Sequence, residues 1–340
     1  MQIKKTIFSF ILAATAIVVS LHVAHAQDIW EKERQMAKSL VTTEKLHDEI
    51  SFLSDTLCQG RATGTEGSLE AARYISQRFE DAGLSRFGYS WLKQFHIGNN
   101  LKGTNVIGFL PGSKSIPCNR YVIVGAHYDH IGTIGDKMYP GADANASGVA
   151  AMTSLAEMFG KMRKMGRILR HNIIFVAFDA KELGFKGSEA FWHLIEYERL
   201  IDPVTGERIS RDKISLMVNI DQIGSMLAPL RQERPDYLIM LGTPSLRKDL
   251  QDVLEECNRR PDSRLDIGLD YYGSKNFTKV FYRLSDQRIF VDNHIPAVFF
   301  TSGITMRTNK TTDTPESLDM EVLQRRIRLM FHWLEHMINN

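Results

Sequence analysis

Histidine and carboxylate side chains follow three separate apolar runs of this chain. These residues are His127 with Asp129 after YVIVGA, Glu182 after NIIFVAF, and Asp221 after SLMVNI. Imidazole and carboxylate groups are the side chains that bind zinc or move protons in enzymes. Each one alone also suits a structural role, as a buried hydrogen-bonded histidine, a helix-capping acid or a turn-forming aspartate. If the three runs end at one edge of a sheet, they predict a metal site or an acid–base site.

The apolar runs are typical of strands that are buried on both faces. The predicted strands are 105–110, 121–125, 172–178, 215–220, 237–241 and 297–301. Apolar residues at helical spacing predict helices over 28–50, 68–83, 147–165, 187–199, 246–257 and 318–338. This alternation is typical of an α/β domain. In such sheets the functional residues gather beyond the carboxyl ends of the strands, which is where the three segments lie.

The composition is that of a folded protein. The chain has 340 residues, 43% of them hydrophobic, with 42 Lys and Arg against 40 Asp and Glu. These values exclude a disordered chain, and without a basic excess they give no indication of nucleic-acid binding. The length allows one large domain or two smaller ones, and without a linker a single domain is the simpler interpretation. The composition gives no prediction of the oligomeric state.

The N-terminal residues have the pattern of a secretory signal peptide. Lys4 and Lys5 precede an apolar run over 6–23, and Ala24-His25-Ala26 offers a cleavage site. A membrane anchor fits less well, because Ser and His interrupt the run and it ends in small residues. We therefore expect residues 1–26 to be removed and 27–340 to form one domain, with a leading helical segment at 27–60. The mature protein would be periplasmic or secreted, with no membrane association after cleavage.

The cysteines do not form a recognisable framework. Cys58, Cys118 and Cys257 are an odd number in the expected mature chain, and their spacing fits no zinc finger. We expect them to be buried structural residues rather than a disulfide framework.

Several motifs, in order along the chain, resemble the co-catalytic zinc aminopeptidase family of clan MH, which includes bacterial leucyl aminopeptidases and glutaminyl cyclases. They are GRATGT, VGAHYDH, GADANASGV, FDAKELGFKGS, NID, SD, IPA and TDTP, between Gly60 and Pro315. The resemblance covers most of the expected mature chain. It implies a mixed, mostly parallel sheet between layers of helices, and the activity of a zinc exopeptidase.

The resemblance also implies a two-zinc site, which this chain could form only in part. His127 and Asp221 match ligands of one metal, and Glu182 matches a ligand of the other. Asp129 matches the catalytic Asp beside the first ligand, where a carboxylate would orient the His127 ring.

Three further positions of the family's site carry other residues. Counting from Ser147, Glu182 and Asp313, Ala144 stands at the bridging Asp, Lys181 at the general-base Glu and Asn309 at the late His. Ala has no lone pair, and a lysine ammonium cannot accept a proton from water. Zinc is the cofactor that the resemblance implies, and these replacements argue against its binding. We expect the Lys181 ammonium to lie near Glu182 or Asp221, where it would replace part of the missing metal charge.

Three functions compete on this basis. The first is a pseudo-peptidase that keeps the fold and binds a peptide or protein ligand without hydrolysing it. The second is an active metallo-exopeptidase whose metal site is rebuilt from His130 and Asp143 together with His127 and Asp221. The third is a hydrolase with Lys181 or a serine as nucleophile, although the chain has no G-x-S-x-G motif. The three replacements favour the pseudo-peptidase.

Overall fold

The fold was analysed in a computed structural model that describes residues 31–113, 119–225, 236–242, 249–271 and 273–339. A nine-stranded mixed sheet forms the centre of the molecule, with β2 beside β3 and the order β1-β3-β7-β4-β8-β11-β9-β10. The strands are β1 (Ser85–Arg86), β2 (Leu92–Ile97), β3 (Leu101–Leu110), β4 (Tyr121–His127), β7 (Asn172–Phe178), β8 (Ile214–Ile220), β9 (Tyr237–Gly242), β10 (Asp266–Gly268) and β11 (Ala297–Thr301). A separate hairpin pairs β5 (Gly132–Ile134) with β6 (Lys137–Tyr139).

Parallel pairing is concentrated in the middle of the sheet. β7, β4, β8 and β11 are mutually parallel neighbours, and β10 is parallel to β9. β1 and β2 pair antiparallel with β3, β3 with β7, and β9 with β11. The mixed sheet predicted from the sequence is therefore confirmed.

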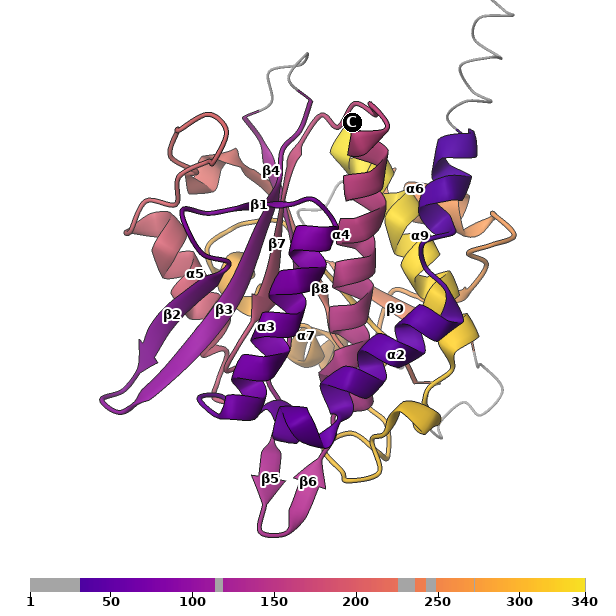
Figure 1. Cartoon of the computed structure of the whole chain (residues 1–340). Helices are drawn as coiled ribbons and strands as arrows, with labels where there is room; N and C mark the ends of the chain where they lie inside the picture. The colour runs from indigo at the N-terminus through magenta and orange to yellow at the C-terminus, as the bar shows by residue number, and fades with distance from the viewer. Residues whose placement is uncertain (1–30, 114–118, 226–235, 243–248, 272, 340) are drawn as a thin grey trace, which may run out of the picture.

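Helices cover both faces of the sheet. They are α2 (Thr43–Ser54), α3 (Glu66–Asp81), α4 (Gly148–Lys164), α5 (Lys186–Glu196), α6 (Asp249–Asn258), α7 (Lys275–Phe281), α8 (Gln287–Asp292) and α9 (Met320–Asn339). α2, α3, α4, α6 and α9 lie on the face toward the viewer in Figure 1, and α5 and α8 pack on the other face. No helix within the described ranges is long and apolar enough to cross a bilayer.

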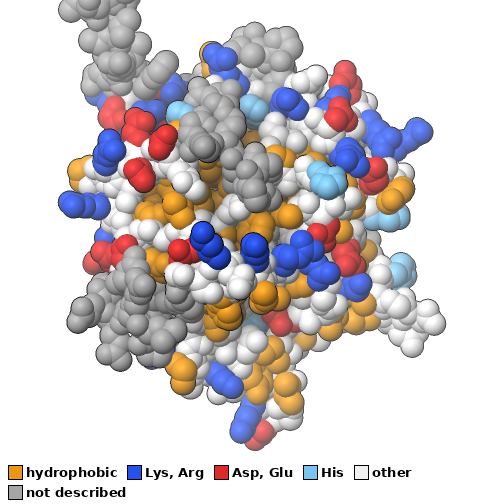
Figure 2. All heavy atoms as spheres, turned by 180° about the vertical axis from the view of Figure 1, so that it is seen from behind, with side chains coloured by type: hydrophobic (Ala, Val, Ile, Leu, Met, Phe, Trp, Pro, Cys, Tyr) orange, Lys and Arg blue, Asp and Glu red, His pale blue; other side chains and the backbone are white. Residues whose placement is uncertain are grey.

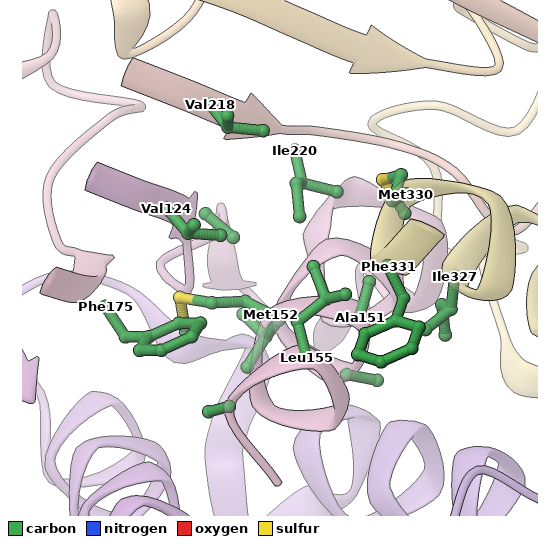
Figure 3. Close-up of a cluster of buried hydrophobic side chains, with 14 of the residues drawn as sticks. Val124, Ala151, Met152, Leu155, Phe175, Val218, Ile220, Ile327, Met330 and Phe331 are labelled. Atoms are coloured by element: carbon green, nitrogen blue, oxygen red, sulfur yellow. The ribbon is translucent and has the colours of Figure 1, made fainter. Parts of the chain in front are cut away.

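The larger core lies between the sheet and the helix layer of α4 and α9. Met152 and Leu155 of α4 extend between strand side chains such as Val124 and the α9 side chains Ile327 and Phe331 (Figure 3). α4 is buried along most of its length, which explains why its sequence is apolar on several sides. This packing fixes the central strands, whose ends carry the candidate site.

The prediction of one continuous helix over 28–50 is wrong. The structure has a helix over 31–38 and a second one, α2, that begins after Thr42. The Thr42 side chain accepts a hydrogen bond from the Lys45 backbone N–H, which is the geometry of a helix N-cap. A cap of this kind starts a new helix, so the apolar spacing continues across a break in the backbone.

The back of the molecule carries elements that were not predicted. Figure 2 shows basic side chains in a band across the middle of this face, with hydrophobic side chains beside them. α7, which lies at the back in Figure 1, contributes exposed side chains of both kinds, including Phe277, Lys279 and Val280. Because α7 and α8 are short and α7 is largely exposed, neither has the apolar periodicity that predicts a helix.

Candidate functional site

The three segments with predicted site residues meet at one edge of the sheet. β7, β4 and β8 are adjacent and parallel, so their carboxyl ends lie side by side. These ends position the loop with Glu182, the side chain of His127, and Asp221, respectively. The juxtaposition expected from the sequence is present.

His127 is fully buried and directly paired with Asp221. Its Nε2 atom lies 3.2 Å from Asp221 Oδ1, and its Nδ1 atom lies 3.1 Å from the backbone oxygen of Asp129. Both neighbours are hydrogen-bond acceptors, so both ring nitrogens are placed to donate. Burial and the Lys181 ammonium would lower the pKa of the His127 imidazole, but the Asp221 charge together with the contacts to Asp221 and Asp129 raises it to about 10.

Asp129 lies beside His127 and also holds the loop after β7. Its carboxylate is 3.6 Å from His127 Nδ1, at ion-pair distance, and its backbone oxygen is the nearer acceptor for the same nitrogen at 3.1 Å. The two carboxylate oxygens also accept the backbone N–H groups of Lys181 and Glu182, each at 3.0 Å. Asp129 therefore positions the loop after β7.

Lys181 and Glu182 form an ion pair within the site. Lys181 Nζ donates to Glu182 Oε1 at 2.9 Å, and both side chains are largely shielded from solvent. Burial opposes the charge on the ammonium, but the Asp221 and Glu182 carboxylates raise the pKa of Lys181 above its ordinary value. The ammonium thus lies beside Glu182 and within the field of Asp221, as expected.

Asp221 is held by one further group that the sequence analysis did not single out. The Ser285 hydroxyl donates to Asp221 Oδ2 at 2.7 Å, and Asn219 Nδ2 in turn donates to Ser285 Oγ at 2.9 Å. Burial would raise the pKa of Asp221, but His127 and Lys181 hold it below its ordinary value. The SD motif was the only sequence signal for Ser285, and its spacing gives no indication of this contact.

Ala144 lies in a buried turn of π-helix, Ala142–Ser147, that precedes α4. The backbone N–H groups of Asp143 and Ala144 donate to the Asp313 carboxylate at 2.8 and 3.1 Å. The Ala144–Asn145 peptide is cis. Ala144 is thus well placed at the edge of the site and offers it no ligand atom.

Asn309 and the alternative ligands do not complete a metal site. Asn309 is exposed in a turn, with a left-handed φ of 60° that asparagine tolerates well. Asp143 Oδ1 accepts from Ser147 Oγ and from the Gly224 backbone N–H. His130 is buried without a hydrogen-bond partner for either ring nitrogen. In the described part of the chain, no three His, Cys, Asp or Glu side chains form a group that could hold a metal, and His130 and Asp143 are not grouped there with His127 and Asp221.

The residues present do not fit the two-zinc centre that the sequence resemblance implies. One metal would keep His127 and Asp221, while the other would keep only Glu182. A catalytic zinc uses three protein ligands and an open position. Glu182 also forms an ion pair with Lys181, which the resemblance assigns to the position of the general base. The arrangement is therefore a cluster formed by the protein alone, in which His127 and Lys181 face the carboxylates of Asp221 and Glu182, and the Asp129 carboxylate lies beside His127.

A buried arginine connects the loops under this site. Arg61 is fully buried and donates to the backbone oxygens of Leu53, Tyr128, Pro140 and Gly141. It joins the end of α2 to the loop after β4 and to the start of the π-helical turn. The Gly-rich segment that contains Arg61 was part of the sequence resemblance, but its anchoring role was not predicted.

Two of the three cysteines can be compared with the prediction. Cys58 and Cys257 are both free and buried, as expected. Cys118 lies outside the described residues, as does the predicted signal peptide at 1–26.

Comparison with known sequences gives one family. Residues 105–334 match the sequence model of Peptidase family M28. The chain is 28% identical over 151 residues to the alkaline phosphatase isozyme conversion protein of Escherichia coli, covering 39% of this chain and 41% of that protein. It is 29% identical over 174 residues to a probable zinc metalloprotease of Pyrenophora teres, covering 49% of this chain and 31% of that one. The matches thus span less than half of these relatives.

Solved structures show the same fold at low sequence identity. LapA aminopeptidase of Legionella pneumophila has a TM-score of 0.66 at 17% identity, covering 91% of this chain and 75% of that one. A zinc aminopeptidase of Bacillus subtilis has 0.65 at 15%, covering 88% and 96%. Glutaminyl cyclase of Porphyromonas gingivalis has 0.60 at 14%, covering 88% and 99%. With the family match over more than half of its length, the chain belongs to Peptidase family M28, a family of zinc metallopeptidases.

Proposed function

We propose that this chain is an exported member of Peptidase family M28 that does not bind zinc and does not hydrolyse peptides. It acts by binding a peptide or protein ligand. The observation that carries the proposal is the Lys181–Glu182 ion pair. By the resemblance, Lys181 takes the position of the family's general base. Its ammonium donates to Glu182, the one acid that remains of the second metal site.

The remaining contacts support the same conclusion. Ala144 provides no bridging carboxylate, and the exposed turn at Asn309 provides no imidazole. His127 and Asp221 stay adjacent, yet two ligands are fewer than a catalytic zinc requires. The family's hydrolysis needs a metal-activated water and a base to take its proton, and this cluster has no group for either task.

Export and ligand binding are each supported by a separate observation. Export is supported by the signal-peptide pattern in residues 1–26. Binding is supported by the retention of the family fold and of a buried polar cluster at the carboxyl ends of the strands, where sheets of this kind bind their ligands.

The proposal can be tested by restoring the family's residues. We would assay hydrolysis of a leucine chromogenic amide, with added zinc, for the wild type and for the triple variant Ala144→Asp, Lys181→Glu, Asn309→His. The matched control is the same triple variant carrying His127→Ala. The wild type is expected to show no hydrolysis above the buffer rate. Wild-type hydrolysis that a chelator abolishes would overturn the proposal, whatever the variants do.

The binding half of the proposal needs its own assay. The wild type would be mixed with a pool of short peptides, separated by gel filtration and analysed by mass spectrometry. Recovery of intact peptides with the protein, reduced by Lys181→Met but not by the exposed change Lys279→Met, would support binding at the cluster. Recovery of cleaved products, or no peptide at all, would contradict it.

A further inference from the structure

A second polar pocket lies on the opposite side of the molecule from the candidate site. Its volume is about 390 Å³, and residues of the helix 31–38, α6, α9 and the segment before β7 line it. Arg167 and Arg170 precede β7, whereas Glu182 follows it, so the pocket lies at the other end of the strands. In Figure 1, α6, the C-terminal part of α9 and the helix 31–38 lie together at the upper right.

The pocket carries more positive than negative charge. Four arginines line it, Arg34, Arg167, Arg170 and Arg260, with Glu256 and Glu335 as the acids. Glu335 is shared, because it lies 2.7 Å from Arg34 Nε and 3.4 Å from Arg167 Nη2.

The other two guanidinium groups are less well neutralised. Arg260 Nη1 is 3.8 Å from Glu31, too far for a hydrogen bond. Arg170 is exposed and has no ion pair within the described residues. Guanidinium groups with unused donors match the oxygens of a carboxylate or phosphate in geometry and charge.

An unsatisfied histidine gives an independent indication of a ligand. His332 lines the same pocket and is only 3% exposed, yet neither of its ring nitrogens has a hydrogen-bond partner. Its Nε2 atom lies 3.7 Å from Asp262 Oδ2, beyond hydrogen-bond distance. Nε2 is thus at ion-pair distance from Asp262, whereas Nδ1 has no partner within the described residues. Buried polar atoms without a partner are rare and cost stability, and a ligand in the pocket is placed to supply one to Nδ1.

We propose that this pocket binds a small organic oxyanion, a carboxylate or a phosphate with a short apolar body. Arg170 and Arg260 would hold the charged oxygens, and His332 would donate to one of them. Ile168, Val253 and Cys257 give the pocket an apolar wall for the rest of the molecule. This site shares no residue with the Lys181 cluster, so its test is independent of the proposed function.

Calorimetric titration of the purified protein at low salt would test the site, with octanoate and inorganic phosphate as separate probes. The test variant is Arg170→Gln/Arg260→Gln. The control is Arg283→Gln/Arg288→Gln, which removes the same charge from two exposed residues, one between α7 and α8 and one within α8, that both lie near Asp292. Thermal melting would verify that both variants are folded.

We expect at least one probe to bind, with affinity at least about tenfold weaker in the test variant and unchanged in the control. Added salt should also weaken binding, because the attraction is largely between charges. Tighter binding of octanoate would assign a carboxylate ligand, and tighter binding of phosphate a phosphate-bearing one. Absence of binding by both probes, or equal affinity in the wild type and the test variant, would overturn the proposal.

Discussion

At the scale of single residues, Lys181 decides the chemistry of the cluster. The sequence resemblance assigns Lys181 to the position of the family's base, and the backbone places its ammonium beside Glu182 in the cluster. Asp129 anchors that backbone by accepting the N–H groups of both Lys181 and Glu182. Asp129 thus maintains the geometry of the loop that carries Lys181 and Glu182.

Replacing Lys181 should reveal its role as an internal counter-ion. Lys181→Met removes the partner of the Glu182 carboxylate and the positive charge near Asp221. We therefore expect the free energy of unfolding to fall by about 2–4 kcal/mol. Urea denaturation would measure it. The double variant Lys181→Met/Glu182→Gln should recover much of the loss, because the unpaired charge is gone. A single variant as stable as the wild type would show that the ion pair contributes nothing.

At the scale of elements, one arginine and one acid join parts that are distant in the sequence. Arg61 joins the end of α2 to two loops beneath the site through four backbone oxygens. Glu49 of α2 connects to the two neighbouring helices, since it lies 3.3 Å from Arg78 Nε of α3 and accepts from Thr153 Oγ1 of α4 at 2.7 Å.

Removal of the Arg61 guanidinium should destabilise the whole domain. Arg61→Met leaves four buried carbonyl groups without their donor, which predicts a loss of at least about 3 kcal/mol. The matched control is Arg73→Met on the exposed side of α3, which should cost less than about 1 kcal/mol. Thermal or urea unfolding of both variants provides the measurement. Equal losses in the two would contradict the anchoring role of Arg61.

Glu49 should make stability depend on pH near neutrality. Burial raises the pKa of Glu49 from 4.5 to about 7, despite the opposing effect of Arg78. The folded state therefore holds this proton more tightly than the unfolded state. That contribution is complete below about pH 4.5 and is lost as the pH rises through about 7.

The test compares the wild type with Glu49→Gln across this interval. Between about pH 4.5 and pH 8, the wild type should lose up to about 3 kcal/mol relative to the variant. Urea unfolding at several pH values would measure the difference. Parallel curves for the two proteins would show that the pKa of Glu49 is not raised by folding.

The central strands and the Lys181–Glu182 contact could be predicted from the sequence, whereas the other contacts at the strand ends could not. The apolar runs at 172–178 and 297–301 coincide with β7 and β11, because strands buried on both faces are continuously apolar. The direct His127–Asp221 contact depends on β4 and β8 being neighbours, which is a property of the sheet order. The same holds for the Ser285 contact with Asp221. Side-chain partners from distant segments have no local pattern.

At the scale of the whole molecule, the two polar sites lie at opposite ends of the central strands. The cluster at the carboxyl ends combines His127 and Lys181 with three acids, and the sequence resemblance assigns it to the family's catalytic position. The pocket near the amino ends is rich in arginine and has no counterpart in the motifs of the sequence. A binding function that involves both sites would not require any hydrolysis.

The measurement that tests the central claim most directly is the zinc content of the purified protein. Elemental analysis would follow dialysis against trace zinc, with the triple variant Ala144→Asp, Lys181→Glu, Asn309→His as the positive control. The account predicts no stoichiometric zinc in the wild type and bound zinc in the control. About one zinc ion or more per wild-type chain, lost in His127→Ala or Asp221→Asn, would show that this cluster is a metal site and would contradict the account.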